Sequence, residues 1–251
     1  DDNNPAGDTN ADGNATAPAT GDWNSIIFAD GTVDGSSALT YCDIRYAGSS
    51  SYGALTFNSS SHNVTNCFVR KSYYGIDCSG TAAPTINSTS IEASTLTPIV
   101  LDFTAAPVFS SLVFSTANNG YDAMGLRGAT LTTAATLPQR GATVGVNPVS
   151  NVTYVLFGQV TINAGGSLTV NPGVVIKPVG GYSFTVNTGG NLTMVGGATA
   201  GDTITVTSIH DDNFGNPNDT NNNGSITAPN RGDWGQIVFA RLQPHNQGGA
   251  L

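Results

Sequence analysis

Residues 63–71 read NVTNCFVRK, and the residue classes in this stretch return twice along the chain at a constant step. Three series share the step: Val64, Ile86 and Val108; Val69, Ile91 and Val113; and Cys67, Thr89 and Ser111. A period of this length without strong helix formers predicts one turn of short strands and bends, in which each strand pairs with the strand one turn away. We therefore expect an all-β solenoid with coils of about 22 residues and polar loop insertions.

The composition favours strands and tight turns over helices. Charged residues make up 10% of the chain, Glu92 is the only glutamate, and Thr, Ser, Asn, Gly, Val and Ile are plentiful. The formal net charge of −9 comes almost entirely from aspartate, and no basic patch exists to neutralise a phosphate backbone. We expect no nucleic-acid partner and an extracellular or cell-surface location. Because no run of about 18 apolar residues occurs, we also expect no membrane insertion.

The stretch 38–46 (ALTYCDIRY) fits the same coil as 63–71, at a slightly longer offset that a longer intervening loop explains. This alignment places Cys42 above Cys67 and Arg45 above Arg70. Cys78 makes the cysteine count odd, so at least one thiol has no disulfide partner within the chain. Two interpretations stay open: buried thiols that act as small hydrophobic residues, or a disulfide between Cys42 and Cys67.

A longer repeat links the two ends of the chain. Residues 8–29 (DTNADGNATAPATGDWNSIIFA) match residues 219–240 (DTNNNGSITAPNRGDWGQIVFA) at an offset of 211, with 13 of 22 positions identical. We interpret the chain, which begins at Asp1, as a processed or excised window on a tandem array. The expected organisation is a loop and entry strand at 1–29, coils at 30–128, a junction at 129–150, further coils at 151–210, and a second copy of the first segment at 211–251.

A family resemblance rests on four runs: NVTYVLFGQVTINAGGSLTVNPGVVIKP (151–178), GGNLTMVGG (189–197), ITVTSIHDDN (204–213) and GDWGQIVFA (232–240). They resemble large bacterial surface and secreted proteins of the right-handed parallel β-helix superfamily, which also contains pectate-lyase-like enzymes. The likeness covers about 140–251 and, through the long repeat, 1–29. It implies a right-handed parallel β-helix and a non-enzymatic scaffold role.

The best candidates for a ligand-binding site lie in the polar insertion of each copy. Residues 8–13 (DTNADG) match the D-x-[DN]-x-[DN]-G pattern, in which alternate oxygen ligands converge on one calcium ion. The usual acid at position 12 of such a loop is replaced by Ala19, so a nearby aspartate has to complete the ligand shell. The candidate calcium ligands are Asp8, Asn10, Asp12 and Asp22 in the first copy and Asp219, Asn221, Asn223 and Asp233 in the second, with Asp211 and Asp212 close in sequence. The alternative is a solvated loop held by its own side-chain hydrogen bonds, and the first copy is the more acidic candidate.

Other residues allow weaker functional interpretations. The GDW tryptophans, Trp23 and Trp234, could stack on sugar rings or could fix the loop onto the coil. The stacked Arg45 and Arg70 could bind an anionic polysaccharide or could pair with Asp43.

No catalytic constellation is evident in the sequence. A glycoside hydrolase needs two carboxylates across a cleft, and Asp43 and Asp77 have no obvious acidic partner. Lys71 and His62 lack the clustered acids that a lyase base would need. We therefore expect that the chain is not an enzyme.

These observations favour a non-enzymatic structural module of a tandemly repeated extracellular protein, such as a filament, sheath, surface layer or long adhesin. The partners would be copies of itself, joined end to end through residues 1–40 and 212–251, and polysaccharide is a further possible partner. A carbohydrate- or ice-binding module is the first alternative. A polysaccharide lyase or hydrolase is the second.

Overall fold

The computed structural model describes residues 10–13, 15–115, 119–199 and 201–240. Within these ranges the chain forms 25 strands and no helix, which confirms the all-β part of the prediction. The strands are β1 (Ile26–Phe28), β2 (Ala38–Thr40), β3 (Asp43–Arg45), β4 (Gly53–Asn58), β5 (Asn63–Thr65), β6 (Phe68–Arg70), β7 (Tyr74–Ser79), β8 (Thr85–Asn87), β9 (Ser90–Glu92), β10 (Ile99–Leu101), β11 (Val108–Ser110), β12 (Val113–Phe114), β13 (Met124–Leu126), β14 (Ala129–Leu131), β15 (Ala134–Leu137), β16 (Ala142–Val144), β17 (Asn147–Val149), β18 (Tyr154–Leu156), β19 (Val160–Ile162), β20 (Ser167–Val170), β21 (Val175–Pro178), β22 (Phe184–Val186), β23 (Asn191–Met194), β24 (Thr205–Val206) and β25 (Ile237–Phe239).

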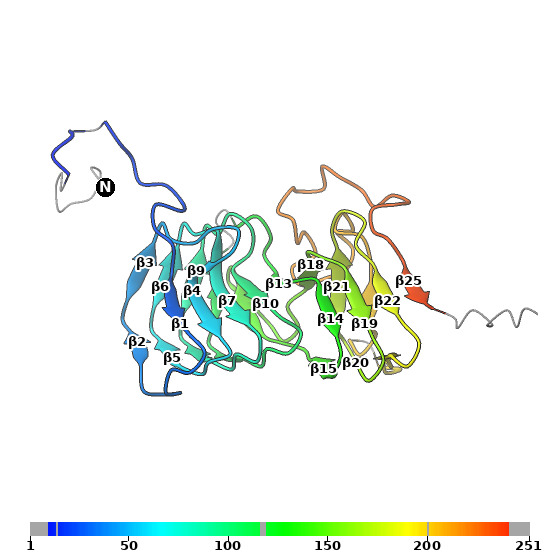
Figure 1. Ribbon diagram of the computed structural model, residues 1–251. Coiled ribbons are helices and arrows are strands. Elements are labelled where there is room, and N and C mark those ends of the chain that lie inside the picture. The colour runs from blue at the N-terminus through cyan, green and yellow to red at the C-terminus, as the bar shows by residue number, and fades with distance from the viewer. Residues whose placement is uncertain (1–9, 14, 116–118, 200, 241–251) are drawn as a thin grey trace, which may run out of the picture.

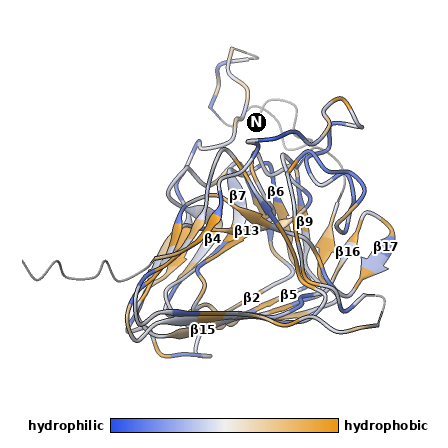
Figure 2. Ribbon diagram, turned by 90° about the vertical axis from the view of Figure 1, so that its right-hand side faces the viewer, coloured by the Kyte–Doolittle hydropathy of each residue, from blue (hydrophilic) through white to orange (hydrophobic). Residues whose placement is uncertain are grey.

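Apart from β17, which pairs antiparallel with β16, the strands stack in parallel, and each pairs with a strand one repeat away in the chain. One sheet runs the whole length of the stack in the order β1-β4-β7-β10-β13-β18-β21-β24, and we call it the long sheet (Figure 1). Two shorter sheets, β2-β5-β8-β11 and β3-β6-β9-β12-β16-β17, accompany its first half, and β14-β19-β22-β25 and β15-β20-β23 accompany its second half. Seen along the stack, the strands lie on three sides of a roughly triangular outline (Figure 2).

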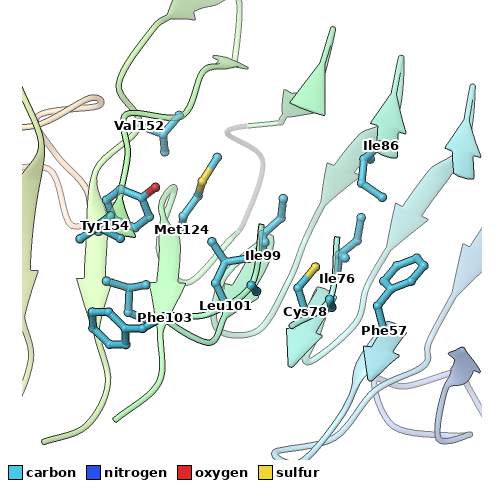
Figure 3. Packing of buried hydrophobic residues seen from close by; sticks show 14 of the residues in the cluster. Phe57, Ile76, Cys78, Ile86, Ile99, Leu101, Phe103, Met124, Val152 and Tyr154 are labelled. Atoms are coloured by element: carbon cyan, nitrogen blue, oxygen red, sulfur yellow. The ribbon is translucent and has the colours of Figure 1, made fainter. Parts of the chain in front are cut away.

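Apolar side chains stack on one another in the interior, because parallel pairing in register places like positions one above the next. On the inner side of the long sheet one row runs through Leu55, Ile76, Ile99, Met124, Tyr154 and Ile176, and a second runs through Phe57, Cys78, Leu101, Leu126 and Leu156. These side chains are buried, and members of both rows lie side by side in Figure 3. The core is therefore a set of ladders rather than a single packed layer.

A single residue with a left-handed backbone turns the chain between two of the sheets in each of the first four coils. Tyr41, Asn66, Ser88 and Ser111 have φ angles of 57°, 53°, 47° and 49°. Each precedes one residue that leads directly into the next strand, so this connection is two residues long in all four coils. We call it the short corner. Asn and Ser tolerate this conformation better than β-branched residues do, since they carry no branch at Cβ.

The predicted steps from Ile86 to Val108 and from Ile91 to Val113 were wrong by one residue. Ile86 pairs with Phe109 rather than Val108, and Ile91 pairs with Phe114 rather than Val113. Ile76 pairs with Ile99, which is one position further along the chain than the constant step predicts, so one extra residue enters the connection before β10. Because strand side chains alternate, that residue turns Val108 outward, where 58% of its surface is exposed.

The first two steps of the ladders are confirmed. Val64 pairs with Ile86, Val69 pairs with Ile91, and Arg45 lies opposite Arg70. The ladder through Cys67 and Thr89 continues to the buried Leu112 rather than to Ser111, for the same one-residue reason.

The segment 129–150, expected as a junction, contains four strands. β14 and β15 begin the two sheets of the second half, while β16 adds to the sheet of β12 and folds back on β17 in an antiparallel pair. The long sheet passes through this region without a break, from β13 to β18. In this segment the two shorter sheets of the first half give way to the two of the second half, while the long sheet continues.

The outer side of the long sheet is also buried between β4 and β21. Its outward side chains there include Thr56, Asp77, Val100, Val155 and Lys177, each at most 2% exposed, whereas Ile27 on the end strand β1 is 45% exposed. Loops cover this face, and in the second half the covering segment is the polar insertion at 207–235, which lies over β18 and β21 in Figure 1. The sheet thus places the charged side chain of Lys177 beneath the polar insertion.

Candidate functional site

Lys177 anchors the second polar insertion to the long sheet. It projects from the outer side of β21 and is fully buried. Its Nζ donates three hydrogen bonds of 2.9 Å, to the carbonyls of Asp211 and Asn218 and to Oγ1 of Thr220. All three donors of the ammonium are therefore used by one loop. Sequence reasoning missed this role, because nothing in the spacing links a strand lysine to a loop so much later in the chain.

The ammonium of Lys177 titrates well below the usual range of a lysine. Burial lowers its pKa to about 8, and this effect outweighs the opposing influence of the Asp212, Asp211 and Asp219 carboxylates. At neutral pH the insertion is therefore built around a buried positive charge with three aspartates close by.

Further hydrogen bonds join the insertion to the coils on both sides of Lys177. Oγ1 of Thr153 accepts from the amide of Asn216 at 2.7 Å, and the amide of Asp122 donates to the carbonyl of Thr220 at 3.0 Å. The side chain of Asn222 donates to the carbonyl of Asn119 at 3.0 Å. The second insertion is therefore part of the folded body.

The predicted calcium loop of the second copy forms a tight turn around Asp219. Its two carboxylate oxygens accept from the amides of Asn223 (3.0 Å) and Gly224 (2.9 Å). The side-chain amide of Asn223 donates to Oγ1 of Thr227 at 2.6 Å, and this hydroxyl lies 2.9 Å from Nδ1 of His210. The turn thus fixes the direction of the side chains at its first, third and fifth positions.

Three acceptor oxygens in this segment are buried without a hydrogen-bond donor: Oδ1 of Asp212, Oδ1 of Asn221 and Oδ1 of Asn223. Buried acceptors normally have a partner, because an unsatisfied one costs about 1–3 kcal/mol. Oxygen atoms of this kind are the ligands that calcium prefers, and two of the three were predicted as ligands from the D-x-N-x-N-G pattern. The third belongs to Asp212, which was predicted only as a neighbour of the ligands in sequence.

Asp233, one of the predicted ligands, accepts two hydrogen bonds from its own segment. Its Oδ2 accepts from Oγ of Ser208 at 2.5 Å and from the amide of Asn230 at 2.7 Å, and these hydrogen bonds hold the pKa of the carboxyl below its usual value. Asp22 accepts from the amide of Ala19 at 2.9 Å, the equivalent contact in the first copy. These two aspartates close the turn before each GDW.

The first copy of the loop repeats part of this geometry. Oγ1 of Thr16 donates to Asp12 at 2.6 Å, as Asn223 pairs with Thr227 in the second copy, and Asn10 contacts both Asp12 and Thr16. Asp8 lies outside the described residues. The side chains described here are largely exposed, and in Figure 1 this segment projects away from the stack.

Trp23 fixes its loop onto the following coil. Its Nε1 donates to the carbonyl of Arg45 at 2.8 Å, and its backbone forms a parallel bridge with Ala47. The indole remains 40% exposed. Of the two interpretations drawn from the sequence, this geometry favours the packing role.

Arg45 and Arg70 are stacked as predicted, and both form ion pairs with acidic side chains. Asp43 contacts Arg45 at 2.5 Å and Arg70 at 3.5 Å, and Glu92 contacts Arg70 at 3.3 Å. The hydrogen bond from Arg45 holds the pKa of Asp43 below its usual value. This alternating charge ladder favours the pairing interpretation over an anion site.

Asp77 has an arginine partner that the sequence did not indicate. Arg127 donates to both of its carboxylate oxygens, at 2.7 and 2.6 Å, and lies 3.7 Å from Asp102. Asp77 is 2% exposed, and burial raises its pKa although Arg127 opposes that shift. A carboxylate whose two oxygens each accept from one guanidinium is suited to fixing the fold rather than to accepting a proton from a substrate.

The cysteines are free thiols in this structure. Cys42 lies over Cys67, whose sulfur accepts from the amide of Cys42 at 3.4 Å, and no disulfide joins them. Cys78 is buried between Phe57 and Leu101, and burial raises the pKa of its thiol. The buried-thiol interpretation therefore describes Cys67 and Cys78, while Cys42 is half-buried.

Across the described ranges, no three His, Cys, Asp or Glu side chains gather as a metal-binding group, and no helix is long and apolar enough to cross a membrane. Comparison of the chain with family models, curated protein sequences and solved structures found no match to any of them.

Proposed function

We propose that this chain is a right-handed parallel β-helix that serves as a non-enzymatic structural module in a tandemly repeated extracellular protein. One observation carries the proposal: the strand after GDW occurs at both ends of the parallel stack, as β1 and as β25. A module of this kind adds length without a new fold, since each coil contacts only its neighbours. A filament, sheath, surface layer or long adhesin fits this behaviour.

The pairing of the conspicuous charges supports a scaffold rather than an enzyme. Asp77 is held by Arg127, and Asp43 is held by two arginines. His62 is buried, packs at a tilt against Phe28, and lies 2.9 Å from a threonine hydroxyl. These groups have structural partners that account for their positions.

We also propose that the second insertion binds calcium through Asp212, Asp219, Asn221 and Asn223. The support is the set of three buried oxygens without donors, together with the matching loop pattern. Isothermal titration of metal-free protein should give saturable heat with calcium, and the melting temperature should rise with it. The paired change Asn221→Ala and Asn223→Ala should abolish both effects. Asn222→Ala, a control whose side chain faces Asn119, should preserve them.

A specific observation favours a binding module as the second candidate. Threonines form two outward ladders in the second half: Thr130, Thr161 and Thr185, and Thr136, Thr169 and Thr193. Rungs about 4.8 Å apart make each ladder a regular row of hydroxyls and methyl groups, suited to ordered water or a polysaccharide. Thermal hysteresis or binding on a glycan array, lost on changing the exposed Thr136 and Thr169 to lysine, would establish this function.

Particle length tests the structural proposal directly. The long sheet takes seven steps from β1 to β24, so one module should add about 34 Å to a rod at about 4.8 Å a step. Chains of one, two and three copies can be built by following residue 240 of one copy with residue 30 of the next. Negative-stain microscopy should show rods that lengthen by this increment. Compact or bead-like particles of unchanged length would reject a rod module.

A further inference from the structure

We infer that consecutive copies join by strand pairing, with β25 of one copy serving as the β1 of the next, so that β22 and the following β4 pair with its opposite edges. This inference rests on the proposed tandem array and specifies its joint. β1 and β25 are equivalent at the offset of 211, with Ile26 matching Ile237 and Phe28 matching Phe239.

The two strands have complementary neighbours. β25 pairs with β22 on one edge, with Ile237 opposite Phe184 and Phe239 opposite Val186. β1 pairs with β4 on one edge, with Ile26 opposite Leu55 and Phe28 opposite Phe57. Each strand ends its sheet, so within the described chain the other edge has no strand partner.

Treating β25 as β1 therefore completes one sheet. Its order becomes β14-β19-β22-β25-β4-β7, in which the last two strands belong to the following copy. The register also agrees, because the row through Val186 and Phe239 would continue into Phe57, and all three side chains belong to inward rows. A slip of one residue would instead turn apolar side chains outward, so this agreement is a strong constraint.

The two insertions show complementary halves of the same contact set. The first copy reaches forward: the Gly21 amide donates to the carbonyl of Tyr46 at 3.0 Å, and Trp23 donates to Arg45. The second copy reaches backward, to Lys177 and Thr153. In an array each insertion would make both sets, and would clamp the last coils of one copy to the first coils of the next.

Burial of one phenylalanine distinguishes a joined end from a free one. Phe28 is 8% exposed and stacks on Phe57, with ring centroids 4.8 Å apart and planes at 4°. Its equivalent, Phe239, is 66% exposed at the free edge. In the joint Phe239 should occupy the place of Phe28, against Phe57 of the following copy.

A fused chain, residues 1–240 followed by residues 30–251, tests the joint. Hydrogen exchange by mass spectrometry should show the amides of residues 237 and 239 at the fusion exchanging at least about 10-fold more slowly than in the single chain, because these amides face the free edge, whereas the Ala240 amide already donates to Val186. Phe239→Ala at the fusion should lower the melting temperature of the fused chain about as much as Phe28→Ala does. In the single chain, Phe239→Ala should change it little.

The outcomes separate the joint from the rod. A rod about 34 Å longer in which the amides of residues 237 and 239 exchange as in the single chain, and in which Phe239→Ala is neutral, overturns the joint and leaves the structural proposal standing. Two bodies joined flexibly, with no added rigid length by small-angle scattering, overturn both. Phe28→Ala confirms that the assay detects loss of the Phe57 stack, since it should destabilise the single and the fused chain alike.

Discussion

Removing Arg127 should destabilise the protein strongly, because it would leave a buried carboxylate without its counter-ion. Asp77 is 2% exposed and receives two hydrogen bonds of 2.7 and 2.6 Å from this guanidinium. Breaking a buried pair at one end costs about 3–5 kcal/mol. Arg127→Leu should therefore lower the free energy of unfolding by that amount in urea denaturation, and should lower the melting temperature by roughly 10 °C.

The double variant Asp77→Val and Arg127→Leu is the matched control. Position 77 lies between Thr56 and Val100 in the outward row, so valine continues the row without a buried charge. The double variant should recover most of the loss, to within about 1–2 kcal/mol of the parent. If it is as unstable as the single variant, packing rather than the uncompensated charge explains the effect.

The pH dependence of Arg127→Leu provides an independent check. Burial already raises the pKa of Asp77, and loss of the arginine that opposes this shift should raise it further. The folded state then takes up a proton that the unfolded state releases, so this residue favours folding at low pH and loses that contribution as pH rises through the folded pKa. The penalty should be smaller near pH 5 than near pH 8, on the usual range of buried carboxyls. A penalty that is the same at both pH values would refute this reasoning.

Three further changes test other parts of the structure. Lys177→Met removes a lysine whose pKa falls from 10.5 in the unfolded state to about 8 on folding. Between these pH values the unfolded state holds the extra proton, so the free energy of unfolding of the parent should rise by about 3 kcal/mol relative to the variant from pH 8 to 10.5. Urea denaturation measures this difference, and parallel pH profiles would contradict it. Phe114→Ala should lower the free energy of unfolding by about 3–5 kcal/mol, because Phe114 is buried, and Val108→Ala by less than about 0.5, because Val108 is 58% exposed. Urea denaturation measures both, and the reverse order would support the ladder of constant step. Trp23→Phe should cost about 1 kcal/mol and should speed hydrogen exchange at residues 21–23, since the hydrogen bond to the Arg45 carbonyl is lost, while a neutral change would argue against the packing role.

The sequence predicted the coil repeat where two successive coils have the same length. Val64 and Ile86 pair as expected because both lie a constant distance from the short corner. The prediction for the following repeat was wrong because one extra residue precedes β10. Phe109 and Phe114 therefore occupy the inward positions that were expected for Val108 and Val113. A fixed period cannot detect an extra residue when the residues on both sides of the expected position are apolar.

One group of ion pairs could be expected from the sequence, and another could not. Arg45 and Arg70 lie at matching positions of adjacent strands, so their stacking could be predicted, and pairing with Asp43 was one of the two interpretations drawn from it. Asp77 and Arg127 are 50 residues apart and meet on the outer side of the long sheet, at a distance set by intervening loops. No local spacing encodes that contact. The same reason hid the anchoring role of Lys177, while the D-x-N-x-N-G pattern was visible because its oxygens belong to one turn.

The short corner also determines where the chain tolerates changes in length. Its two-residue connection is the same after β2, β5, β8 and β11, whereas the connections elsewhere in these coils vary, and the long connection between β24 and β25 contains the polar insertion. A residue added at the short corner would displace every following side chain in its ladder, but one added at another corner extends a loop. Divergence between copies, and any peptide displayed on the surface by engineering, should therefore concentrate at the other corners and leave this edge unchanged in length.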